Sequence, residues 1–388
     1  MVSNLKRQCS IVIAGGGTGG HVTPALAIAA ATRADLQNNT DVTHSETRID
    51  VHFIGTINGI ERTMVPNAGW PIDLLPAKKI KGQSKLRRLI AITSLLPNTW
   101  RAWRILCKKK ATVVIGVGGY ASVPAVLAAV LRRTPVIIIE ANAIPGLANR
   151  YLSKFAKAVI TNYDLNSADH DGKHYFNPTK VHQLGNPVRQ KILTAFTAEG
   201  TTHDSQSEKH SSKTLLVLGG SQGARAINNM IKDAANDLLH AIPNLHIIHQ
   251  CGRANFDELN AHYKATQLDV DLRAFIDDMP AVYKVADLVI SRAGATTLSE
   301  LAIAGKAAIF IPLPSATDNH QWHNAERYAA KDAAVLLNQK DLSPAKLAET
   351  VHTWLTDDGK RSALAHNIRT LSKPHAATQI VNLALQIC

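Results

Sequence analysis

Cysteine is scarce in this sequence. The 388 residues include four cysteines, at Cys9, Cys107, Cys251 and Cys388. They form no C-x-x-C pair, so their spacing indicates neither a disulfide framework nor a zinc site, and it favours a reducing cytoplasm. The amino terminus also lacks the apolar core of a signal peptide, because a few polar residues lead directly into a short predicted strand.

Aromatic residues are few as well, at 5% of the chain, although hydrophobic residues make up 45%. This balance is typical of α/β proteins, whose parallel sheets are filled by valine, isoleucine, leucine and alanine. A chain of 388 residues is long enough for two domains that each have their own core.

No uncharged run reads as a membrane span. The longest one, residues 111–131, has the length of such a span, but glycines and Pro124 interrupt it. It is better explained as a strand at 112–117, a glycine turn, and a helix with Pro124 in its first turn.

Acidic residues are absent between Leu74 and Ile139, where 13 lysines and arginines occur. This stretch accounts for the net charge of +13, so the rest of the chain is close to neutral. Most of the bases lie in residues 78–110, among leucines, isoleucines and two tryptophans. Such a segment favours contact with an anionic membrane surface over contact with nucleic acid. The alternative is a solvated basic face whose apolar residues belong to the core. We expect Pro97 to divide the segment into two short helices.

Apolar β-branched runs alternate with helical patterns along the chain, which predicts two doubly wound parallel α/β domains. Strands are expected near 10–14, 51–54, 112–117, 135–139, 158–161, 181–184, 214–218, 245–250, 272–275, 287–291, 307–311 and 334–337. The first domain is expected at 1–188 and the second at 189–366. A helical segment at 367–388 is expected to pack back on the first domain.

Two glycine-rich loops, about two hundred residues apart, each follow an apolar strand. The first is Gly15–His21 and the second is Gly219–Ala224. Each has the pattern of a strand, a tight turn and a helix start, which points backbone N–H groups at an anion. Two such loops, each opening its own half of the chain, predict Rossmann-like domains that face each other across a cleft.

Polar and glycine-rich segments recur after the carboxyl ends of predicted strands. They are Gly15–His21, Gly118–Ser122, Glu140–Asn142, Gly219–Ala224, Ser291–Thr297 and Pro314–Gln321. Ligands bind at this edge of open parallel sheets, so the six segments predict one site in the cleft.

The first loop formally satisfies the dinucleotide pattern G-x-G-x-x-G. That pattern also requires an acid at the end of the second strand, and the nearest one, Glu61, lies too far along the chain, so a nicotinamide cofactor is not favoured.

His21 follows the loop at a helix start, where the helix dipole disfavours the imidazolium. A neutral imidazole there could accept a hydroxyl proton, although a histidine that merely stiffens the loop is the alternative.

The second half offers groups for a phosphate and a sugar. The Gly219–Ala224 loop is expected to hold a phosphate through its backbone N–H groups and the Ser221 hydroxyl. Glu300 falls early in the next predicted helix, where its carboxylate could accept both hydroxyls of a ribose or simply complement the helix dipole. No metal site is expected, because His320 and His323 lack a third ligand and Asp269-Val270-Asp271 precedes a strand instead of following one.

These residues resemble the MurG family, the bacterial N-acetylglucosaminyltransferases that make lipid II in peptidoglycan synthesis. The matching motifs run in order through nearly the whole chain: GGGTGGHVTPALAIA at 15–29, GVGGYASVPAVLAA at 116–129, GNPVR at 185–189, GGSQGARAIN at 219–228, FIDDM at 275–279, SRAGATTLSELAIAGKAAIFIP at 291–312 and DNHQWHNA at 318–325. The chain departs from the family at Ile139 and Ala141, where the family usually has histidine and glutamine.

The resemblance implies a GT-B fold and an inverting transfer of N-acetylglucosamine from its UDP donor to the 4-hydroxyl of the muramoyl unit of lipid I, without a cofactor or metal. It implies action at the cytoplasmic face of the inner membrane. His21 is the first choice for the base and Glu140 the second. The resemblance suggests these further binding residues: Thr18, Gly19 and Gly20 in the cleft; Asn142 and Arg189 at the donor; Ser221 at its phosphate; Ile276 at the uracil; Ala295, Thr296, Thr297, Leu298, Ser299 and Glu300 at phosphate and ribose; and Gln321 at the sugar.

Two rival functions remain open. A UDP-N-acetylglucosamine 2-epimerase shares the fold and the donor, but its soluble substrate needs no basic apolar surface. The other rival is a non-enzymatic protein that binds the membrane surface, but such a function does not explain the two predicted anion-binding loops.

Overall fold

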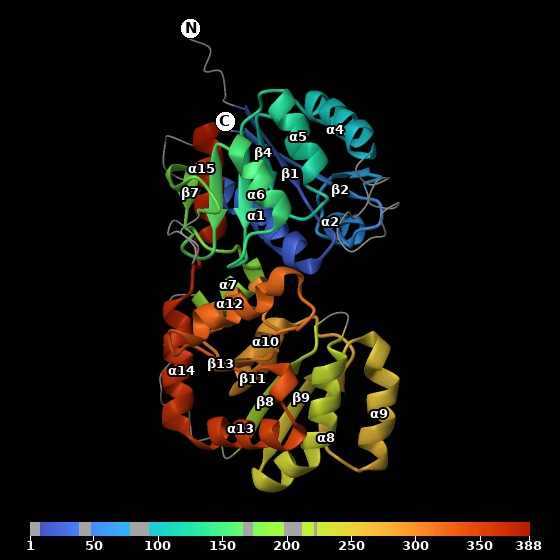
Figure 1. Cartoon of the computed structure of the whole chain (residues 1–388), viewed down its shortest axis with the longest axis vertical. Coiled ribbons are helices and arrows are strands. Elements are labelled where there is room, and N and C mark those ends of the chain that lie inside the picture. The colour runs from blue at the N-terminus through green and yellow to red at the C-terminus, as the bar shows by residue number, and fades with distance from the viewer. Residues whose placement is uncertain (1–7, 39–47, 78–92, 166–173, 198–211, 221–222) are drawn as a thin grey trace. The chain divides into compact units, whose positions relative to one another are not determined.

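The computed structural model describes residues 8–38, 48–77, 93–165, 174–197, 212–220 and 223–388 (Figure 1). The chain divides into two compact units. The first unit comprises Met1–Gln190 and Lys373–Cys388, and the second comprises Lys191–Ser372. The division therefore falls after residue 190, whereas sequence analysis placed it after residue 188.

The first unit contains a seven-stranded parallel sheet in the order β3-β2-β1-β4-β5-β6-β7. The strand order reverses between β1 and β4, and this is where open parallel sheets bind ligands. The strands are β1 Gln8–Ala14, β2 Arg48–Thr56, β3 Ile72–Leu75, β4 Val113–Gly116, β5 Val136–Glu140, β6 Ala158–Thr161 and β7 Val181–His182. The helices are α1 Gly19–Asn38, α2 Glu61–Asn67, α4 Leu95–Lys108, α5 Val123–Leu131, α6 Leu147–Leu152 and α15 Ala376–Ile387.

Strand β1 is buried on both faces. Its residues from Cys9 to Ala14 are all buried, without the alternation of a half-exposed strand. Helices must therefore cover both faces of the sheet.

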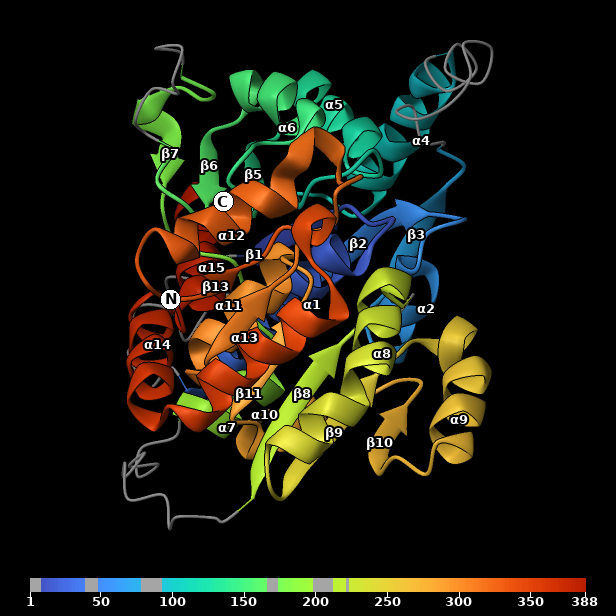
Figure 2. The same ribbon diagram turned by 60° about the horizontal axis from the view of Figure 1, so that its bottom comes forward.

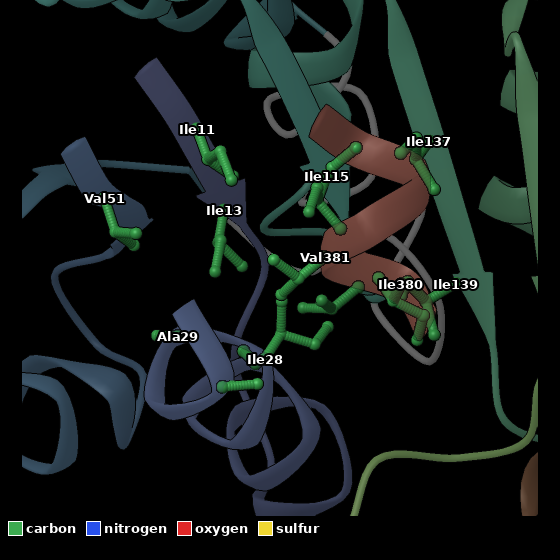
Figure 3. Close-up of a cluster of buried hydrophobic side chains, with 14 of the residues drawn as sticks. Ile11, Ile13, Ile28, Ala29, Val51, Ile115, Ile137, Ile139, Ile380 and Val381 are labelled. Carbon is green, nitrogen blue, oxygen red and sulfur yellow. The ribbon is translucent and has the colours of Figure 1, made fainter. Parts of the chain in front are cut away.

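The carboxyl-terminal helix α15 completes the core of the first unit. Its residues Ile380 and Val381 lie among Ile13, Ile28 and Ile115, which come from β1, α1 and β4 (Figure 3). Helix α14, Asp358–Thr370, belongs to the second unit, so the expected segment 367–388 is divided between the units.

The second unit contains a six-stranded parallel sheet in the order β10-β9-β8-β11-β12-β13, which reverses between β8 and β11. The strands are β8 Lys213–Leu218, β9 Leu245–Gln250, β10 Val270–Arg273, β11 Leu288–Ser291, β12 Ala308–Phe310 and β13 Val335–Leu336. The helices are α7 Gln190–Thr197, α8 Arg225–Ala241, α9 Phe256–Ala265, α10 Met279–Val285, α11 Ala295–Ala304, α12 His320–Ala329, α13 Pro344–Thr356 and α14.

Helices α8 and α13 lie side by side on this second sheet (Figures 1 and 2). Ile227 and Ile231 of α8 share a buried cluster with Val351 of α13 and with Val217 and Ile290 of the sheet. The prediction of two parallel-sheet α/β domains is confirmed.

Four local expectations are corrected by the structure. Strand β3 was missed, because it is four residues long and contains Asp73. Strand β10 begins at Val270, two residues before the expected start at 272. Pro97 does not break α4, because it lies in the first turn, where a proline costs no hydrogen bond. The rest of the expected basic segment, 78–92, lies outside the described residues.

The fourth correction concerns cysteine. Cys9 and Cys388 are joined by a disulfide, with their Cα atoms 5.9 Å apart. The bond links the start of β1 to the residue after α15. Its partners are 379 residues apart in sequence, so spacing gave no sign of the pair.

The stretch 111–131 has the predicted form: β4, a turn, and α5 with a proline in its first turn. None of the helices among the described residues is long and apolar enough to cross a membrane.

Candidate active site

His21 lies at the switch point of the first sheet. It is the third residue of α1, which follows the glycine loop after β1. Its Nδ1 is 3.2 Å from the Thr18 hydroxyl, and its backbone N–H donates to the Thr18 carbonyl at 3.1 Å. Thr18 thus connects the loop to both the backbone and the ring of His21.

The His21 ring packs against the turn after β4. A Cβ on Gly118 would lie 3.1 Å from the ring, and one on Gly119 would lie 3.2 Å from it. Both glycines have positive φ, at +93° and +75°, where other residues are strained. The two glycines of the G-V-G-G pattern therefore allow the tight turn and leave space for the imidazole to pack against its backbone.

Glu61 was set aside in sequence analysis, yet its carboxylate occupies the first glycine loop. Oε2 accepts from the Gly17 N–H at 2.7 Å. Oε1 accepts from the N–H and the hydroxyl of Thr56, each at 2.8 Å. The side chain is almost completely buried, and a Cβ on Gly16 or Gly59 would overlap it. The Gly17 amide, expected to face a bound anion, is already bonded to a carboxylate of the chain itself.

Glu140, the second choice for the base, is buried at the end of β5. One carboxylate oxygen accepts from the backbone N–H of Asn142 at 2.9 Å and from its side-chain amide at 3.1 Å. The other accepts from the Gly146 N–H at 2.9 Å and from the Asn149 amide at 2.8 Å. Both oxygens are therefore engaged in holding the loop that follows β5.

Asn149 connects this loop to the His21 turn. Its amide nitrogen also donates to the Ile139 carbonyl, and it lies 3.5 Å from the position of a Cβ on Gly118. Its Oδ1 is buried and has no hydrogen-bond partner among the described residues. Ile139 itself lies in the core of the first unit (Figure 3), so this departure from the family pattern is an apolar packing position.

Four other predicted residues of the first unit are at least partly accessible. Thr18 and Gly20 are exposed, and Gly19 is intermediate. Arg189 is half-buried just before α7, after the turn that contains Gly185.

The second glycine loop differs from the first. It leaves β8 after Leu218, which pairs in register with Ser291 at the end of β11. The turns that begin α8 and α11 therefore start side by side. A Cβ on Gly220 would meet no atom of the described residues within 4 Å, whereas a Cβ on Gly16 would overlap the Glu61 carboxylate. Ser221 lies outside the described residues.

Helix α11 presents an open amino terminus. Gly294 precedes it without a side-chain cap, and the Thr296 hydroxyl is buried with no partner among the described residues. Ser299 is buried and donates to the Ala295 carbonyl at 3.0 Å, and Leu298 is a fully buried core residue. Thr296 and Thr297, in the first turn of α11, are half-buried, whereas the rest of the predicted segment 295–300 is buried.

Glu300 is 4% exposed, and its Oε2 accepts from the Tyr283 hydroxyl at 3.4 Å. Ile276 is also buried, in the turn between β10 and α10. Gln321 is half-buried in the first turn of α12, and its Oε1 accepts from the Leu313 N–H at 3.0 Å. These three residues follow three different strands of the second sheet.

A buried polar network that the sequence did not reveal supports the second loop. His249 lies between the Asn228 carbonyl oxygen at 3.1 Å and the Tyr263 hydroxyl at 3.2 Å. Burial lowers the pKa of His249 to about 4, so the ring is neutral at pH 7. The Asn228 oxygen would lie 2.9 Å from a Cβ on Gly219, so the network packs directly beneath the loop.

The residues that sequence analysis considered as possible metal ligands make other contacts. Asp271 forms an ion pair with Arg273 at 2.6 Å, which lowers the pKa of the Asp271 carboxyl. His320 contacts the Thr317 carbonyl, and His323 contacts Glu326. Within the described ranges, no cluster of three histidine, cysteine or acidic residues could hold a metal ion.

Family comparison accounts for both units. The N-terminal domain of glycosyltransferase family 28 matches residues 11–161, and its C-terminal domain matches residues 214–380. The chain is 38% identical over 378 residues to a protein of Anaeromyxobacter dehalogenans named UDP-N-acetylglucosamine–N-acetylmuramyl-(pentapeptide) pyrophosphoryl-undecaprenol N-acetylglucosamine transferase, covering 97% of this chain and 92% of that one. The protein of that name from Bdellovibrio bacteriovorus is 37% identical, with coverage of 97% and 99%.

Comparison with solved structures gives the same family. The crystal structure of Acinetobacter baumannii MurG matches with a TM-score of 0.72 and 30% identity, over 97% of this chain and 99% of that one. A UDP-GlcNAc 2-epimerase from Neisseria meningitidis matches with a TM-score of 0.65 at 16% identity, which shows a shared fold alone. The resemblance seen in the motifs is confirmed: the chain belongs to glycosyltransferase family 28 and, within it, to the MurG family.

Proposed function

We propose that this chain transfers N-acetylglucosamine from UDP-N-acetylglucosamine to the 4-hydroxyl of the muramoyl unit of an undecaprenyl-pyrophosphate-linked acceptor. The relatives' names give the two substrates. The observation that carries the proposal is the pair of helix starts, α8 and α11, that leave adjacent strands of the second sheet in register.

These helix starts fit the diphosphate of the donor. Helix amino termini attract anions through free N–H groups and the helix dipole. Neither α8 nor α11 has a side-chain cap, and no atom of the described residues lies within 4 Å of a Cβ built on Gly220. We assign the diphosphate to these two turns, with Ser221 and Thr296 contributing hydroxyls.

The ribose, uracil and sugar of the donor are assigned to residues that follow other strands of the second sheet, at its carboxyl edge. Glu300 accepts the ribose hydroxyls, the turn at Ile276 holds the uracil, and Gln321 contacts the sugar. Asn142 and Arg189 are assigned to the donor from the first unit.

The reaction is a direct displacement at the anomeric carbon. The acceptor hydroxyl attacks opposite the departing UDP, so an α-linked donor gives a β-linked product. The transition state is oxocarbenium-like, as in glycoside hydrolysis. Negative charge grows on the leaving diphosphate, where preorganised N–H groups of α8 and α11 stabilise it.

His21 takes the proton of the attacking hydroxyl. Its ring is held by Thr18 and by the Gly118–Gly119 turn, which fixes the orientation that general base catalysis requires. Glu140 is assigned a positioning role, because its two oxygens already accept four hydrogen bonds.

One assay tests this function. UDP release from UDP-N-acetylglucosamine is measured with and without a polyprenyl-linked muramoyl acceptor. Acceptor-dependent release with a β-linked product supports the transferase. Release that produces the manno epimer without acceptor supports the epimerase instead, and the absence of turnover supports a non-enzymatic surface module.

The cytoplasmic face of the inner membrane is the location that the family resemblance implies, and the basic helix α4 supports contact with a membrane surface. Leu96, Trp100 and Trp103 are 80%, 58% and 40% exposed, on a helix that carries Arg101, Arg104 and Lys108. The Arg104 guanidinium lies 5.0 Å from the centre of the Trp100 ring. Exposed tryptophans beside basic residues are typical of helices that lie in the interface of an anionic bilayer.

Vesicle binding tests the membrane assignment. Leu96→Ser with Trp100→Ser should reduce retention on anionic vesicles severalfold, whereas Val285→Ser, at an exposed apolar residue of the second unit, should not. Retention should fall with added salt. Equal retention on neutral vesicles would reject the electrostatic part of the proposal.

A further inference from the structure

The two glycine loops of this chain are alike in sequence but not in structure. In the part of the chain that the structure describes, no atom lies within 4 Å of a Cβ built on Gly220, whereas a Cβ on Gly16 would overlap the carboxylate of Glu61. A carboxylate is itself an oxyanion, and it binds the Gly17 N–H at 2.7 Å, as a phosphate oxygen would. The first loop therefore already contains an anionic ligand, which the chain supplies.

The surroundings of Glu61 are built for this carboxylate. Three glycines give it room, because a Cβ on Gly16, Gly55 or Gly59 would overlap the side chain. Gly55 and Gly59 do not have the left-handed backbone that favours glycine, so space is the reason for glycine there. Among the described residues, its hydrogen-bond donors are the Gly17 N–H, three residues after β1, and the N–H and hydroxyl of Thr56, the last residue of β2.

The carboxylate connects to the candidate base through two residues. Gly17, with φ at +86°, immediately precedes Thr18. Thr18 accepts from the His21 N–H at 3.1 Å through its carbonyl and lies 3.2 Å from the imidazole Nδ1 through its hydroxyl. The hydrogen bond to Gly17 thus fixes the peptide from which Thr18 orients the ring.

We propose that Glu61 is a positioning residue for the transfer reaction: its buried carboxylate fills the first glycine loop, holds the Gly17 amide and thereby orients His21 toward the acceptor hydroxyl. This inference rests on the proposed function of His21. It also assigns the two loops different partners. The second loop takes the diphosphate of the donor, and the first loop, with its Gly17 amide occupied and a negative charge beside it, takes a neutral hydroxyl.

The test is Glu61→Gln in the full chain. A glutamine that keeps its oxygen toward the two Thr56 donors must turn its NH₂ group toward the Gly17 N–H, so only the Gly17 contact is lost. The kcat should fall about 10- to 100-fold, while the KM for UDP-N-acetylglucosamine and the Kd for UDP change less than twofold. The Gly17 amide proton should move upfield in the NMR spectrum.

Thr56→Val is the matched control. It removes one hydrogen bond from the same buried carboxylate and leaves the Gly17 contact intact. Its kcat should stay within about threefold of the wild-type value, even if its melting temperature falls as far as that of Glu61→Gln. A purely structural role would reduce activity in the two variants in proportion to their loss of stability.

A second variant moves the carboxylate by a different route. Gly59→Ala places a methyl group where the Glu61 carboxylate lies, and should reproduce the selective loss of kcat. A kcat equal to that of the wild type in folded Glu61→Gln and Gly59→Ala would overturn the inference. Failure of both variants to fold would also overturn it, because Glu61 would then serve stability alone.

His21→Ala and the wild-type chain are measured in the same assay. A wild-type chain that transfers no sugar rejects the proposed function, whereas a loss in His21→Ala alone rejects only the role of Glu61.

Discussion

The candidate base His21 is held in place by the first glycine loop and by the turn after β4. Thr18 contacts the ring at 3.2 Å, and two glycines with positive φ leave room for it. The position is therefore specified by backbone conformation as much as by side chains, and a glycine pattern in the sequence was sufficient to predict it.

The first prediction at this scale concerns the base. His21→Ala should lower kcat about 100-fold or more, because general base catalysis typically contributes 10²–10⁴. The Kd for UDP, measured by calorimetry, should stay within twofold. His182→Ala, at an exposed histidine of the same unit, is the control. An unchanged kcat in His21→Ala removes it from the chemistry.

Glu300 gives the second prediction. Hydrogen bonds to a charged group contribute about 1.5–3 kcal/mol, so Glu300→Ala should weaken UDP binding about 10- to 100-fold. Glu349→Ala, an exposed acid on α13, should leave the Kd unchanged. Equal affinities for UDP in the wild type and in Glu300→Ala would refute the ribose assignment.

His249 gives a prediction about pH. Its pKa is about 4 in the folded chain, against 6.5 for an ordinary histidine. Between these values the unfolded chain binds more protons, so the stability of the second unit must fall as the pH falls from 6.5 toward 4. The loss from pH 7 to pH 5 should be about 2 kcal/mol, since one pKa unit corresponds to about 1.4 kcal/mol.

Denaturant unfolding at the two pH values measures this loss. His249→Gln should remove most of it, whereas His246→Gln, at an exposed histidine on the same strand, should retain it. The same pH dependence in both variants would show that the buried ring is not its source.

Residues with a periodic or glycine-rich context were predictable, and isolated buried polar residues were not. Thr18, His21 and the α11 turn belong to motifs that follow strands. Glu61 and Asn149 carry no local pattern, because what makes them important is a contact with a loop 44 or 31 residues away. Gly55 and Gly59 leave room for the Glu61 side chain in the structure, but the sequence alone did not link them to it.

At the scale of elements, burial on both faces made the central strands easy to predict. Strands β1, β4, β5, β8 and β11 consist almost wholly of buried residues, and all were predicted within two residues of their ends. Strand β3 is an edge strand with intermediate exposure, and its short mixed sequence has no comparable signal. The position of Pro97 in the first turn of α4 could not be known without the helix start.

Helix α15 carries the element-scale prediction. Ile380 is fully buried against β1 and α1, so Ile380→Ala should destabilise the first unit by about 2–5 kcal/mol. Gln379→Ala, at an exposed neighbour on the same helix, should change stability by less than about 0.5 kcal/mol. Thermal unfolding of the two variants checks this. Equal melting temperatures would mean that α15 does not support the core.

At the scale of the whole molecule, the chain repeats one architecture, for which we propose two different tasks. Each unit has a parallel sheet whose order reverses beside a glycine loop. The Glu61 carboxylate lies against Gly16 in the loop of the first unit, whereas no described residue comes within 4 Å of a Cβ built on Gly220 in the second. Both loops were expected to point N–H groups at an anion, with the phosphate assigned to the second; the Glu61 contact of the first could not be foreseen, because Glu61 lies outside both motifs.

The central claim is that the donor's nucleotide binds the loop of the second unit and not that of the first. Titration of the ¹⁵N-labelled chain with UDP, followed by amide chemical shifts, tests this directly. We predict large shifts at Gly220, Gly223 and residues 295–300, with the Gly17 amide unchanged. Shifts at Gly17 and its neighbours, with none in the second unit, would contradict the account.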